Sequence, residues 1–374
     1  MKIAVLKESD AETRVAAIPE TVKKFIGLGA SVAIEKGAGD RASIAEDDYV
    51  VAGATVGTRA DALKDAGLIL CVTGPEPASL EGAMAGALLV GALDPTRRPD
   101  AIAGYAKAGV EALAMEWMPR ITRAQSMDIL SSQSNLAGYK AVVDAASVYG
   151  RAFPMMMTAA GTVSPAKAFV MGVGVAGLQA IATARRLGAQ VSATDVRSAT
   201  REQIQSLGAK PIFVENVAGI EGEGQGGYAG ETSAEYQAAQ AELVSGHIAK
   251  QDIVITTALI PGRPAPRLIT DAQVATMRAG SVIVDLAAEA GGNVEGCVPG
   301  ESVVRHGVTI VGAVQLSRTL AADASALFAR NLANFLIAFW DQESGMPLLP
   351  DEDEIVAAIR LTKGGEVVSD RLKP

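Results

Sequence analysis

The chain has 374 residues, a length that accommodates two domains with a buried core in each. Thirty-nine glycines and a hydrophobic content of 49 % are typical of an α/β protein with many tight turns and exclude a disordered chain. The formal net charge of -9 argues against nucleic acid or an anionic membrane surface as a direct partner. The two cysteines, Cys71 and Cys297, have neither CxxC nor Cys/His spacing, so we expect no disulfide framework, no metal site and a reducing compartment.

The N-terminal third of the chain alternates short apolar runs with helical stretches. We interpret the runs at 3–6, 31–35, 68–73, 87–93 and 110–117 as β-strands, and the stretches at 19–28, 45–51 and 98–108 as helices. Such alternation predicts right-handed crossovers and a mainly parallel sheet. The run at 3–6 is too short for a signal peptide, and no window offers about 18 uninterrupted apolar residues, so we expect no membrane insertion.

The segment 120–135 carries a series of short polar side chains. A helix beginning near Met127 would place four of them on one face, namely Asp128, Ser131, Ser132 and Asn135. A solvated helix face normally carries Lys, Glu and Arg, so we interpret this face as the wall of a polar cleft. The alternative is a simple helix start, in which Ser126 caps the first turn and Asp128 complements the helix dipole.

The alternation restarts after residue 165, with strands expected at 168–171, 190–194, 211–214, 252–256, 281–286 and 308–312. Long helical patterns at 127–148 and 320–340 bracket this second series. We therefore expect an α/β protein with two Rossmann-like parallel-sheet domains, separated by a cleft and joined by these helices. The first domain would be residues 1–126 with 315–374, and residues 127–314 would form an inserted NAD(H)-binding domain. The acidic segment 350–354 is expected to be loosely held.

The strand expected at 168–171 runs into Gly172-Val173-Gly174-Val175-Ala176-Gly177, which opens a helical run ending at Gly188. A bare G-x-G-x-x-G is weak, but its place between a strand and a helix, with Asp195 after the next strand, predicts a dinucleotide site. Gly172 would permit the tight turn, Gly174 would let the backbone approach the pyrophosphate, and Gly177 would let the helix pack on the strand.

Asp195 also bears on the choice of cofactor. Its carboxylate would accept hydrogen bonds from the adenosine ribose and repel a 2′-phosphate, which favours NAD(H) over NADP(H). Arg197 leaves two interpretations open, because it could receive a 2′-phosphate or be a surface charge. The loops at 257–262 and 286–289 should line the crevice at the strand ends. Neither His247 nor His306 joins a serine or cysteine motif.

A glycine-rich segment lies between residues 219 and 230, with six glycines in twelve residues and Tyr228 as its one aromatic residue. Its composition leaves a mobile lid and an inert linker equally open. As a lid, it would close over bound NADH with Tyr228 as the anchor.

Several of these segments together resemble the NAD(H)-binding component of proton-translocating nicotinamide nucleotide transhydrogenase. They are PRITRAQSMDILSSQSNLAGY, AFPMMMTAAGT, GVGVAGLQAIATARRLGA, TDVR and TTALIPG, and the similarity runs from the first strand to about Trp340. The wider superfamily includes alanine dehydrogenase, which looks alike around Lys7-Glu8 and Arg14-Val15-Ala16. That family uses a lysine and a histidine on its first domain, whereas the corresponding stretches 71–75 and 91–95 contain neither.

The resemblance implies roles for individual residues. Arg120, Gln125 and Asp128 would orient the nicotinamide and its ribose, not act as acids or bases, and Ser131 would contact the carboxamide. The stretch 312–318 departs from the family's pattern at the rim of the cleft. The full set expected to bind cofactor is Ser131, Gly172, Gly174, Val175, Ala176, Gly177, Asp195, Val196, Arg197, Gly227, Tyr228, Gln240, Thr257, Ala258 and Leu259.

The resemblance further implies hydride transfer from NADH bound here to NADP⁺ bound on a partner component. A separate membrane-spanning component would couple the transfer to proton movement. Hydride passes directly between two nicotinamide rings, so the reaction needs proximity and orientation and no protein acid or base. We also expect a homodimer at the cytoplasmic face of the inner membrane, held there by its partners. The rival interpretations are an alanine dehydrogenase-like amino-acid oxidoreductase and a catalytically idle NADH-binding module.

Overall fold

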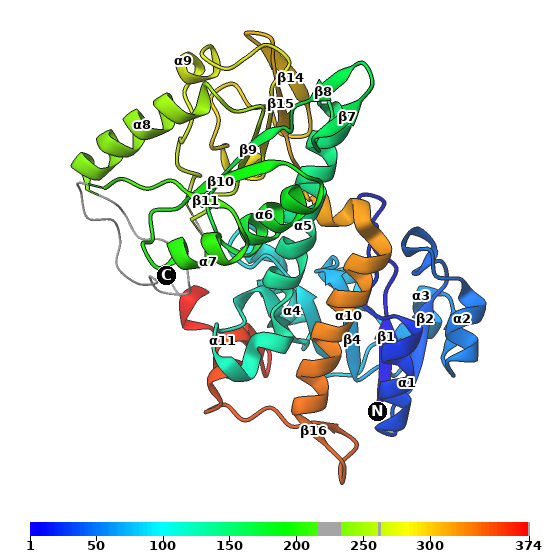
Figure 1. Cartoon of the computed structure of the whole chain (residues 1–374). Helices are drawn as coiled ribbons and strands as arrows, with labels where there is room; N and C mark the ends of the chain where they lie inside the picture. The colour runs from blue at the N-terminus through cyan, green and yellow to red at the C-terminus, as the bar shows by residue number, and fades with distance from the viewer. Residues whose placement is uncertain (216–232, 261–262, 373–374) are drawn as a thin grey trace. The chain divides into compact units, whose positions relative to one another are not determined.

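The structure, a computed structural model, describes residues 1–215, 233–260 and 263–372 and divides into two compact units. Unit 1 consists of Met1–Gln133 and Arg318–Pro374, and unit 2 is the intervening Ser134–Ser317 (Figure 1). The chain enters unit 2 within helix α5 (Ile129–Val148) and leaves it within the 3-10 helix η7 (Leu316–Leu320). The boundaries expected from the sequence, 126/127 and 314/315, lie a few residues before these.

Unit 1 is built on a six-stranded parallel sheet with the strand order β3-β2-β1-β4-β5-β6. Its strands are β1 (Lys2–Val5), β2 (Ser31–Glu35), β3 (Thr55–Gly57), β4 (Leu68–Thr73), β5 (Leu88–Ala92) and β6 (Glu111–Ala114). The five expected strands are present, β3 is an additional one, and the strand expected at 110–117 ends at Ala114. The order reverses between β1 and β4, where a parallel sheet opens a crevice at its carboxyl edge.

Helices cover both faces of this sheet. They are α1 (Pro19–Gly27), α2 (Glu46–Val51), α3 (Arg59–Leu63), α4 (Pro99–Lys107), the first turn of α5, α10 (Ala321–Ala338) and α11 (Glu354–Ile359). Successive strand residues face opposite sides. Accordingly, Ile3 belongs to the core that contains Phe335 of α10, and the neighbouring Ala4 belongs to the core that contains Tyr105 of α4. Helix α10 is orange in Figure 1.

Short elements complete unit 1. They are the 3-10 helices η1 (Asp40–Ala42), η2 (Pro77–Leu80), η3 (Met115–Trp117), η4 (Thr122–Met127) and η8 (Asp370–Leu372), and the hairpins of β16 (Trp340–Asp341) with β17 (Met346–Pro347) and β18 (Thr362–Lys363) with β19 (Glu366–Val367).

Unit 2 contains a seven-stranded sheet with the order β11-β10-β9-β12-β13-β15-β14. Its strands are β9 (Lys167–Met171), β10 (Gln190–Thr194), β11 (Lys210–Pro211), β12 (Ile253–Thr256), β13 (Val282–Asp285), β14 (Ser302–Arg305) and β15 (Val308–Gly312). All pairings are parallel except that of β14 with β15. The strand expected at 211–214 is instead β11 at the sheet edge, where Pro211, lacking an N–H group, is tolerated.

The helices of unit 2 are α6 (Val175–Arg186), α7 (Thr200–Ser206), α8 (Ala234–Ile248) and α9 (Asp271–Val274), with the 3-10 helix η6 (Ala288–Ala290) and most of α5. One core packs α5 and α6 against one face of the sheet, and a second core packs α8 and α9 against the other. A separate hairpin joins β7 (Met156–Thr158) to β8 (Gly161–Val163).

The acidic segment near the end of unit 1 is well anchored, so the expectation that it is loosely held was wrong. Asp353 caps α11 by accepting hydrogen bonds from the backbone N–H groups of Ile355 and Val356, at 2.9 and 3.4 Å. Asp351 forms ion pairs with Arg360 and Lys363. Among the residues that the structure describes, no helix has both the length and the apolar character needed to cross a membrane.

Candidate functional site

Strand β9 ends in a glycine turn that leads directly into α6. Gly172 has φ +96°, a region that favours glycine, and a Cβ atom there would lie 2.6 Å from Thr257 Oγ1. A Cβ atom on Gly177 would overlap the carbonyl oxygen of Gly172. Gly174 is the N-cap of α6 and offers no side-chain oxygen to the first-turn N–H groups. These groups and the helix dipole therefore form an anion-binding helix start.

Asp195 follows β10, the strand next to β9, and its carboxylate is buried and fully engaged. Oδ2 accepts from the backbone N–H of Val173 at 2.7 Å, and Oδ1 accepts from the backbone N–H of Arg197 at 2.9 Å. The guanidinium of Arg197 adds a bond to each oxygen, both at 2.9 Å. Arg197 is only 8 % exposed, so its interpretation as a surface charge was wrong.

The loop after β12 forms a second wall beside the glycine turn. Thr257 N–H donates to the carbonyl oxygen of Met171 and Thr257 Oγ1 to that of Gly172, both at 2.9 Å. Ala258 is held by the side chain of Asn293, and Leu259 is 43 % exposed. The wall thus has a fixed base and an exposed apolar rim.

Helix α5 passes over the first turn of α6 within unit 2. A Cβ atom on Gly138 would overlap the carbonyl oxygen of Ala176, so the two backbones approach more closely than any side chain would permit. Asn135 Nδ2 lies 3.4 Å from Gln179 Oε1 across the same pair of helices. A glycine inside a helix is unfavourable by about 1 kcal/mol, and the close approach explains why it is present here.

The start of α5, in unit 1, differs from the expected geometry. Residues 122–127 form η4, Asp128 has an extended backbone, and α5 begins at Ile129. Asp128 is itself the cap: Oδ1 accepts from the backbone N–H of Ser131 at 2.9 Å, and Oδ2 accepts from its hydroxyl at 2.6 Å. The capping role assigned to Ser126 was therefore wrong, because the helix starts two residues later.

Two asparagines of α10 hold η4 in place. Asn331 Nδ2 and Asn334 Nδ2 both donate to the carbonyl oxygen of Ser126, at 2.8 and 3.0 Å, and Asn331 Oδ1 accepts from the hydroxyl of Ser132 at 2.7 Å. Gln125 and Arg120 are exposed, so their side chains extend from an anchored segment.

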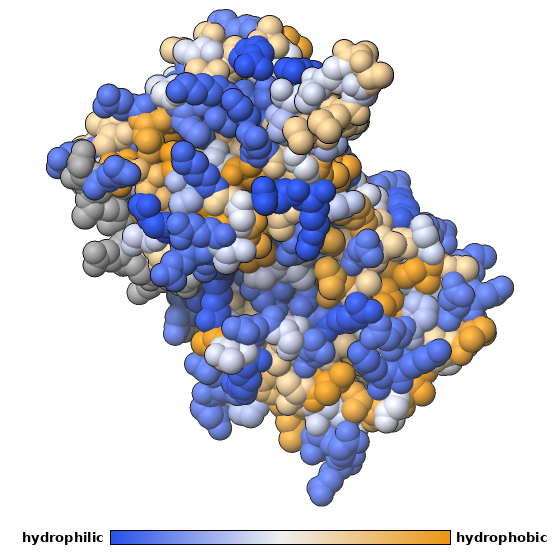
Figure 2. All heavy atoms as spheres, viewed as in Figure 1, coloured by the Kyte–Doolittle hydropathy of each residue, from blue (hydrophilic) through white to orange (hydrophobic). Residues whose placement is uncertain are grey.

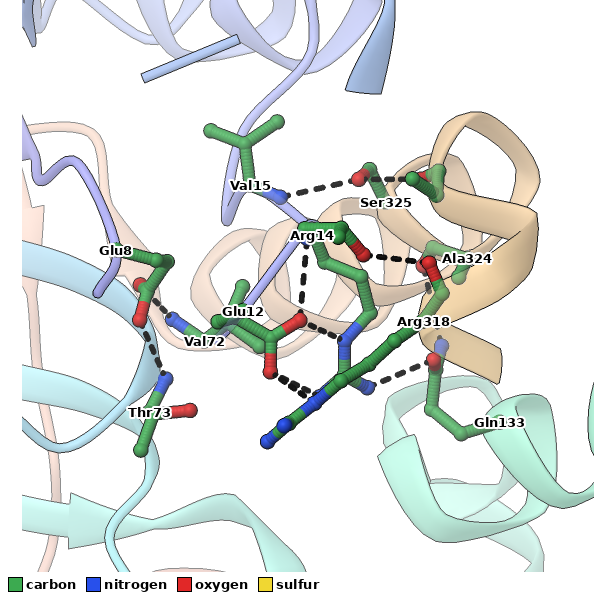
Figure 3. Close-up of polar contacts among 12 residues, drawn as sticks. Glu8, Glu12, Arg14, Val15, Val72, Thr73, Gln133, Arg318, Ala324 and Ser325 are labelled. Carbon is green, nitrogen blue, oxygen red and sulfur yellow. Dashed lines mark hydrogen bonds and ion pairs between the residues drawn. The ribbon is translucent and has the colours of Figure 1, made fainter. Parts of the chain in front are cut away.

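A buried carboxylate with two arginines lies at the same end of unit 1 (Figure 3). Arg14 donates to both oxygens of Glu12, at 2.7 and 2.8 Å, and to Gln133 Oε1 at 2.9 Å. Arg318 Nε lies 2.8 Å from Glu12 Oε2 as an ion-pair contact, outside hydrogen-bond geometry. Burial raises the pKa of Glu12, but the hydrogen bonds from Arg14 outweigh it and the net pKa is lowered. The 312–318 stretch thus contributes Arg318 to this cluster.

Two further carboxylates join neighbouring strand ends of the unit 1 sheet. Glu8, after β1, accepts from the backbone N–H groups of Val72 and Thr73 at 2.6 and 3.1 Å (Figure 3). Glu116, after β6, accepts from Leu93 and Asp94 at 2.8 and 2.5 Å. Burial is the largest cause that raises the pKa of each to about 7. Sequence reasoning missed both, because their partners lie on other strands.

Comparison with known proteins gives a consistent result. The alanine dehydrogenase/PNT N-terminal domain matches residues 4–137, and the alanine dehydrogenase/PNT C-terminal domain matches residues 141–370. The chain is 53 % identical over 383 residues to the first polypeptide of the split NAD(P) transhydrogenase subunit alpha of Rhodospirillum rubrum, covering 100 % of this chain and 99 % of that relative. This chain belongs to the alanine dehydrogenase/PNT family.

Solved structures of the alanine dehydrogenase/PNT family agree with this assignment. A transhydrogenase from Sinorhizobium meliloti has a TM-score of 0.89 and 54 % sequence identity, covering 98 % of this chain and 100 % of that one. An L-alanine dehydrogenase has a TM-score of 0.81 and 25 % identity, covering 100 % and 98 %. The resemblance to transhydrogenase and the expected fold class are confirmed.

The residues expected at the site fall into two groups in this family member. The glycine turn 172–177, residues 195–197 and residues 257–259 follow the adjacent strands β9, β10 and β12 at one edge of the unit 2 sheet. Arg120, Gln125, Asp128 and Ser131 lie together in unit 1. Gln240 is half-buried on α8. Gly227 and Tyr228, with the glycine-rich segment, lie outside the described residues, as do residues 261 and 262 of the second loop.

Proposed function

We propose that this chain binds NADH in unit 2 and passes hydride to NADP⁺ bound on a separate component of a transhydrogenase complex. The observation that carries the proposal is the start of α6, with its uncapped first turn, positive-φ Gly172 and a buried carboxylate, Asp195, at the next strand end. A helix start of this kind suits a pyrophosphate, and the carboxylate suits a ribose without a 2′-phosphate.

The bonds of Asp195 fit a role in nucleotide binding in two stages. The backbone N–H groups of Val173 and Arg197 hold the carboxylate in place, and the Arg197 side chain occupies its remaining acceptor positions. A ribose diol offers two O–H donors, so it can replace the two side-chain bonds while the two backbone bonds persist. NAD(H) is therefore the proposed cofactor, with NADP(H) on the partner.

Unit 1 supplies orienting groups in this proposal. Arg120, Gln125 and Asp128 belong to a segment anchored by Asn331 and Asn334, and Ser131 is tied to Asp128. Direct hydride transfer depends on placing two nicotinamide rings at contact distance, to which a rigid segment contributes more than an acid or a base. An anchored loop with exposed polar side chains suits that task.

An amino-acid dehydrogenase is less well supported. A substrate carboxylate would require a free cationic partner in unit 1, but Arg14 already donates to Glu12 and Gln133. The strand-end segment 71–75 offers Thr73 and Gly74 in place of a lysine, and the segment 91–95 offers Asp94 in place of a histidine.

The test is a reconstitution with a purified NADP(H)-binding component and an NADP⁺ analogue whose reduced form absorbs apart from NADH. We expect NADH-dependent reduction of the analogue only when both components are present. An idle binding module predicts NADH binding without transfer, and an amino-acid dehydrogenase predicts reduction of NAD⁺ by alanine without the partner. Either outcome would overturn the proposal.

The proposed complex also includes a membrane-spanning component that couples hydride transfer to proton movement, and this chain would lie at the cytoplasmic membrane face through its partners. In sealed vesicles containing all components, an imposed proton gradient should change the transhydrogenation rate. A rate that does not respond to the gradient or to its collapse would exclude the coupling.

We further propose that the chain forms a homodimer through the hairpin β7–β8. Met155, Met156 and Met157 are 61 %, 43 % and 79 % exposed, and the hairpin pairs with no other strand among the described residues. Its region at the upper right of Figure 2 is pale orange and white instead of blue. An isolated hairpin is marginally stable in water, so an apolar surface of a second copy would stabilise it.

A further inference from the structure

Asn293 joins three separate segments of unit 2 in the loop after β13. Its side chain is fully buried, with 0 % exposure. Oδ1 accepts from the backbone N–H of Ala258 at 3.0 Å, and Nδ2 donates to the carbonyl oxygens of Ala258 and Pro266 at 2.9 and 2.8 Å. The amide thus uses its oxygen and both of its N–H groups within the protein.

The backbone of Asn293 is fixed as firmly as its side chain. Its carbonyl oxygen accepts from the N–H groups of Leu268 and Ile269 at 2.8 and 3.0 Å. The next N–H, of Val294, donates at 3.0 Å to Asp285, a carboxylate with 0 % exposure. Asn293 is therefore a rigid support and not a mobile side chain that happens to reach Ala258.

The residue that Asn293 holds lies directly against the glycine turn. A Cβ atom on Gly172 would lie 3.3 Å from the nitrogen of Ala258, and the preceding Thr257 donates to the carbonyl oxygen of Gly172. A shift of Ala258 would therefore move the wall that faces the helix start of α6. Because the N–H of Ala258 is committed to Asn293, the loop presents apolar groups, including the exposed Leu259, to a ligand.

We infer that Asn293 is a positioning residue for nicotinamide nucleotide binding, which acts by holding the 257–259 wall at a fixed distance from the glycine turn. The inference rests on the proposed function, because it assumes that the glycine turn receives NADH. It assigns the chemistry of that wall as well: an apolar surface for the flat face of a nucleotide ring system, with its polar backbone groups turned inward to Asn293.

The first test compares Asn293→Ala with Gln251→Ala by calorimetric titration with NADH. Gln251 is a matched control, because it is 5 % exposed, donates to the carbonyl oxygen of His247 at 3.1 Å, and lies before β12, at the opposite end of the strand. Loss of a buried partner should weaken NADH binding to Asn293→Ala by about tenfold or more. Gln251→Ala should bind within about twofold of the parent, although both variants lose thermal stability. Equal affinities in the two variants would overturn the inference.

A second variant keeps the inference testable if Asn293→Ala fails to fold. In Asn293→Asp, a protonated carboxyl can still accept from Ala258 and donate to one carbonyl oxygen, whereas the ionised form faces two carbonyl oxygens without a proton. NADH affinity relative to the parent, measured at each pH, should therefore recover as the pH is lowered from 8 to 5.5. The parent carries the same neighbouring carboxylate, Asp285, so the ratio isolates position 293. A ratio that does not change with pH overturns the inference.

Amide hydrogen exchange without nucleotide tests the structural premise separately. The Ala258 N–H should exchange slowly in the parent and in Gln251→Ala, and much faster in Asn293→Ala. Fast exchange in the parent would overturn the inference. A parent that binds no NADH would instead refute the proposed function, and the inference would fall with it.

Discussion

Asp195 is the residue on which cofactor choice depends. Its four bonds come from two backbone N–H groups and the Arg197 guanidinium, and the two kinds of donor differ in what a ligand can replace. The backbone donors are fixed by the glycine turn and by the chain following β10. The guanidinium donors belong to one side chain, which can swing away when a ribose supplies hydroxyl donors.

We expect opposite effects from changing the two partners. Asp195→Ala should weaken NADH binding by more than about tenfold, since a charge-assisted hydrogen bond contributes roughly 1.5–3 kcal/mol, and should leave weak NADPH binding unchanged or improved. Arg197→Ala should leave NADH affinity equal or tighter, because it removes the group that competes for the carboxylate. Calorimetry showing equal NADH affinity in Asp195→Ala and the parent would remove Asp195 from the site.

Glu116 provides a prediction of pH-dependent stability. Its ordinary pKa of 4.5 rises to about 7 in the fold, chiefly through burial. Between these values the folded chain binds more protons than the unfolded chain, so the stability present at low pH is lost as the pH rises through about 7. Glu116→Gln cannot ionise and should gain on the parent by about 1–3 kcal/mol more at pH 8 than at pH 5.

Denaturant unfolding at the two pH values measures this difference. Glu81→Gln is the matched control, because it removes one negative charge from an exposed position of the same unit. An advantage of Glu116→Gln that is the same at pH 5 and pH 8 would contradict the raised pKa.

At the scale of elements, the start of α5 combines a helix cap with the proposed orienting segment. Asp128 accepts from the backbone and hydroxyl of Ser131, and an N-cap of this kind contributes about 1 kcal/mol. Asp128→Ala should therefore lower the free energy of unfolding by about that amount, whereas Asp128→Asn should keep most of it. Both should slow transhydrogenation if the charge orients the nicotinamide ribose. A parental rate in Asp128→Asn would make Asp128 a helix cap alone.

The 3-10 helix η4 carries the most discriminating test of hydride transfer. Gln125 is exposed, next to Ser126, whose carbonyl oxygen is held by two asparagines of α10. As a positioning group, Gln125 should affect rate more than binding. Gln125→Ala and Gln125→Asn should each slow transfer by at least about tenfold, roughly 1.4 kcal/mol of barrier, with NADH affinity nearly intact. A parental rate in the reconstituted complex would refute the orienting role.

At the scale of the whole molecule, the exposed hairpin predicts the oligomeric state. The parent should sediment as a dimer, and Met157→Lys should shift it towards the monomer, because a charge in an apolar interface loses its hydration. Val51→Lys is the control, since Val51 is 80 % exposed and lies on α2 of unit 1, outside the hairpin. A monomeric parent, or equal masses for Met157→Lys and the parent, would exclude the hairpin as the interface.

Two parallel-sheet units, the interruption of the first by the second, and the dinucleotide turn all follow from local patterns in the sequence. Strands and crossover helices have distinct periodicities, and a glycine turn between them needs no distant partner to be recognised. Elements of two or three residues were the exception: β3 and β11 owe their form to pairing with a neighbouring strand, which local periodicity does not report.

The tertiary structure alone decided how the polar side chains are used. Arg197 turned from a surface charge into the partner of Asp195, Asp128 became the cap of α5, and Asn293 became the support of the 257–259 wall. Glu8 and Glu116 found their donors on other strands. A buried polar group must satisfy its hydrogen bonds with whatever the fold brings near it, and those partners are set by strand order and loop path, not by sequence spacing.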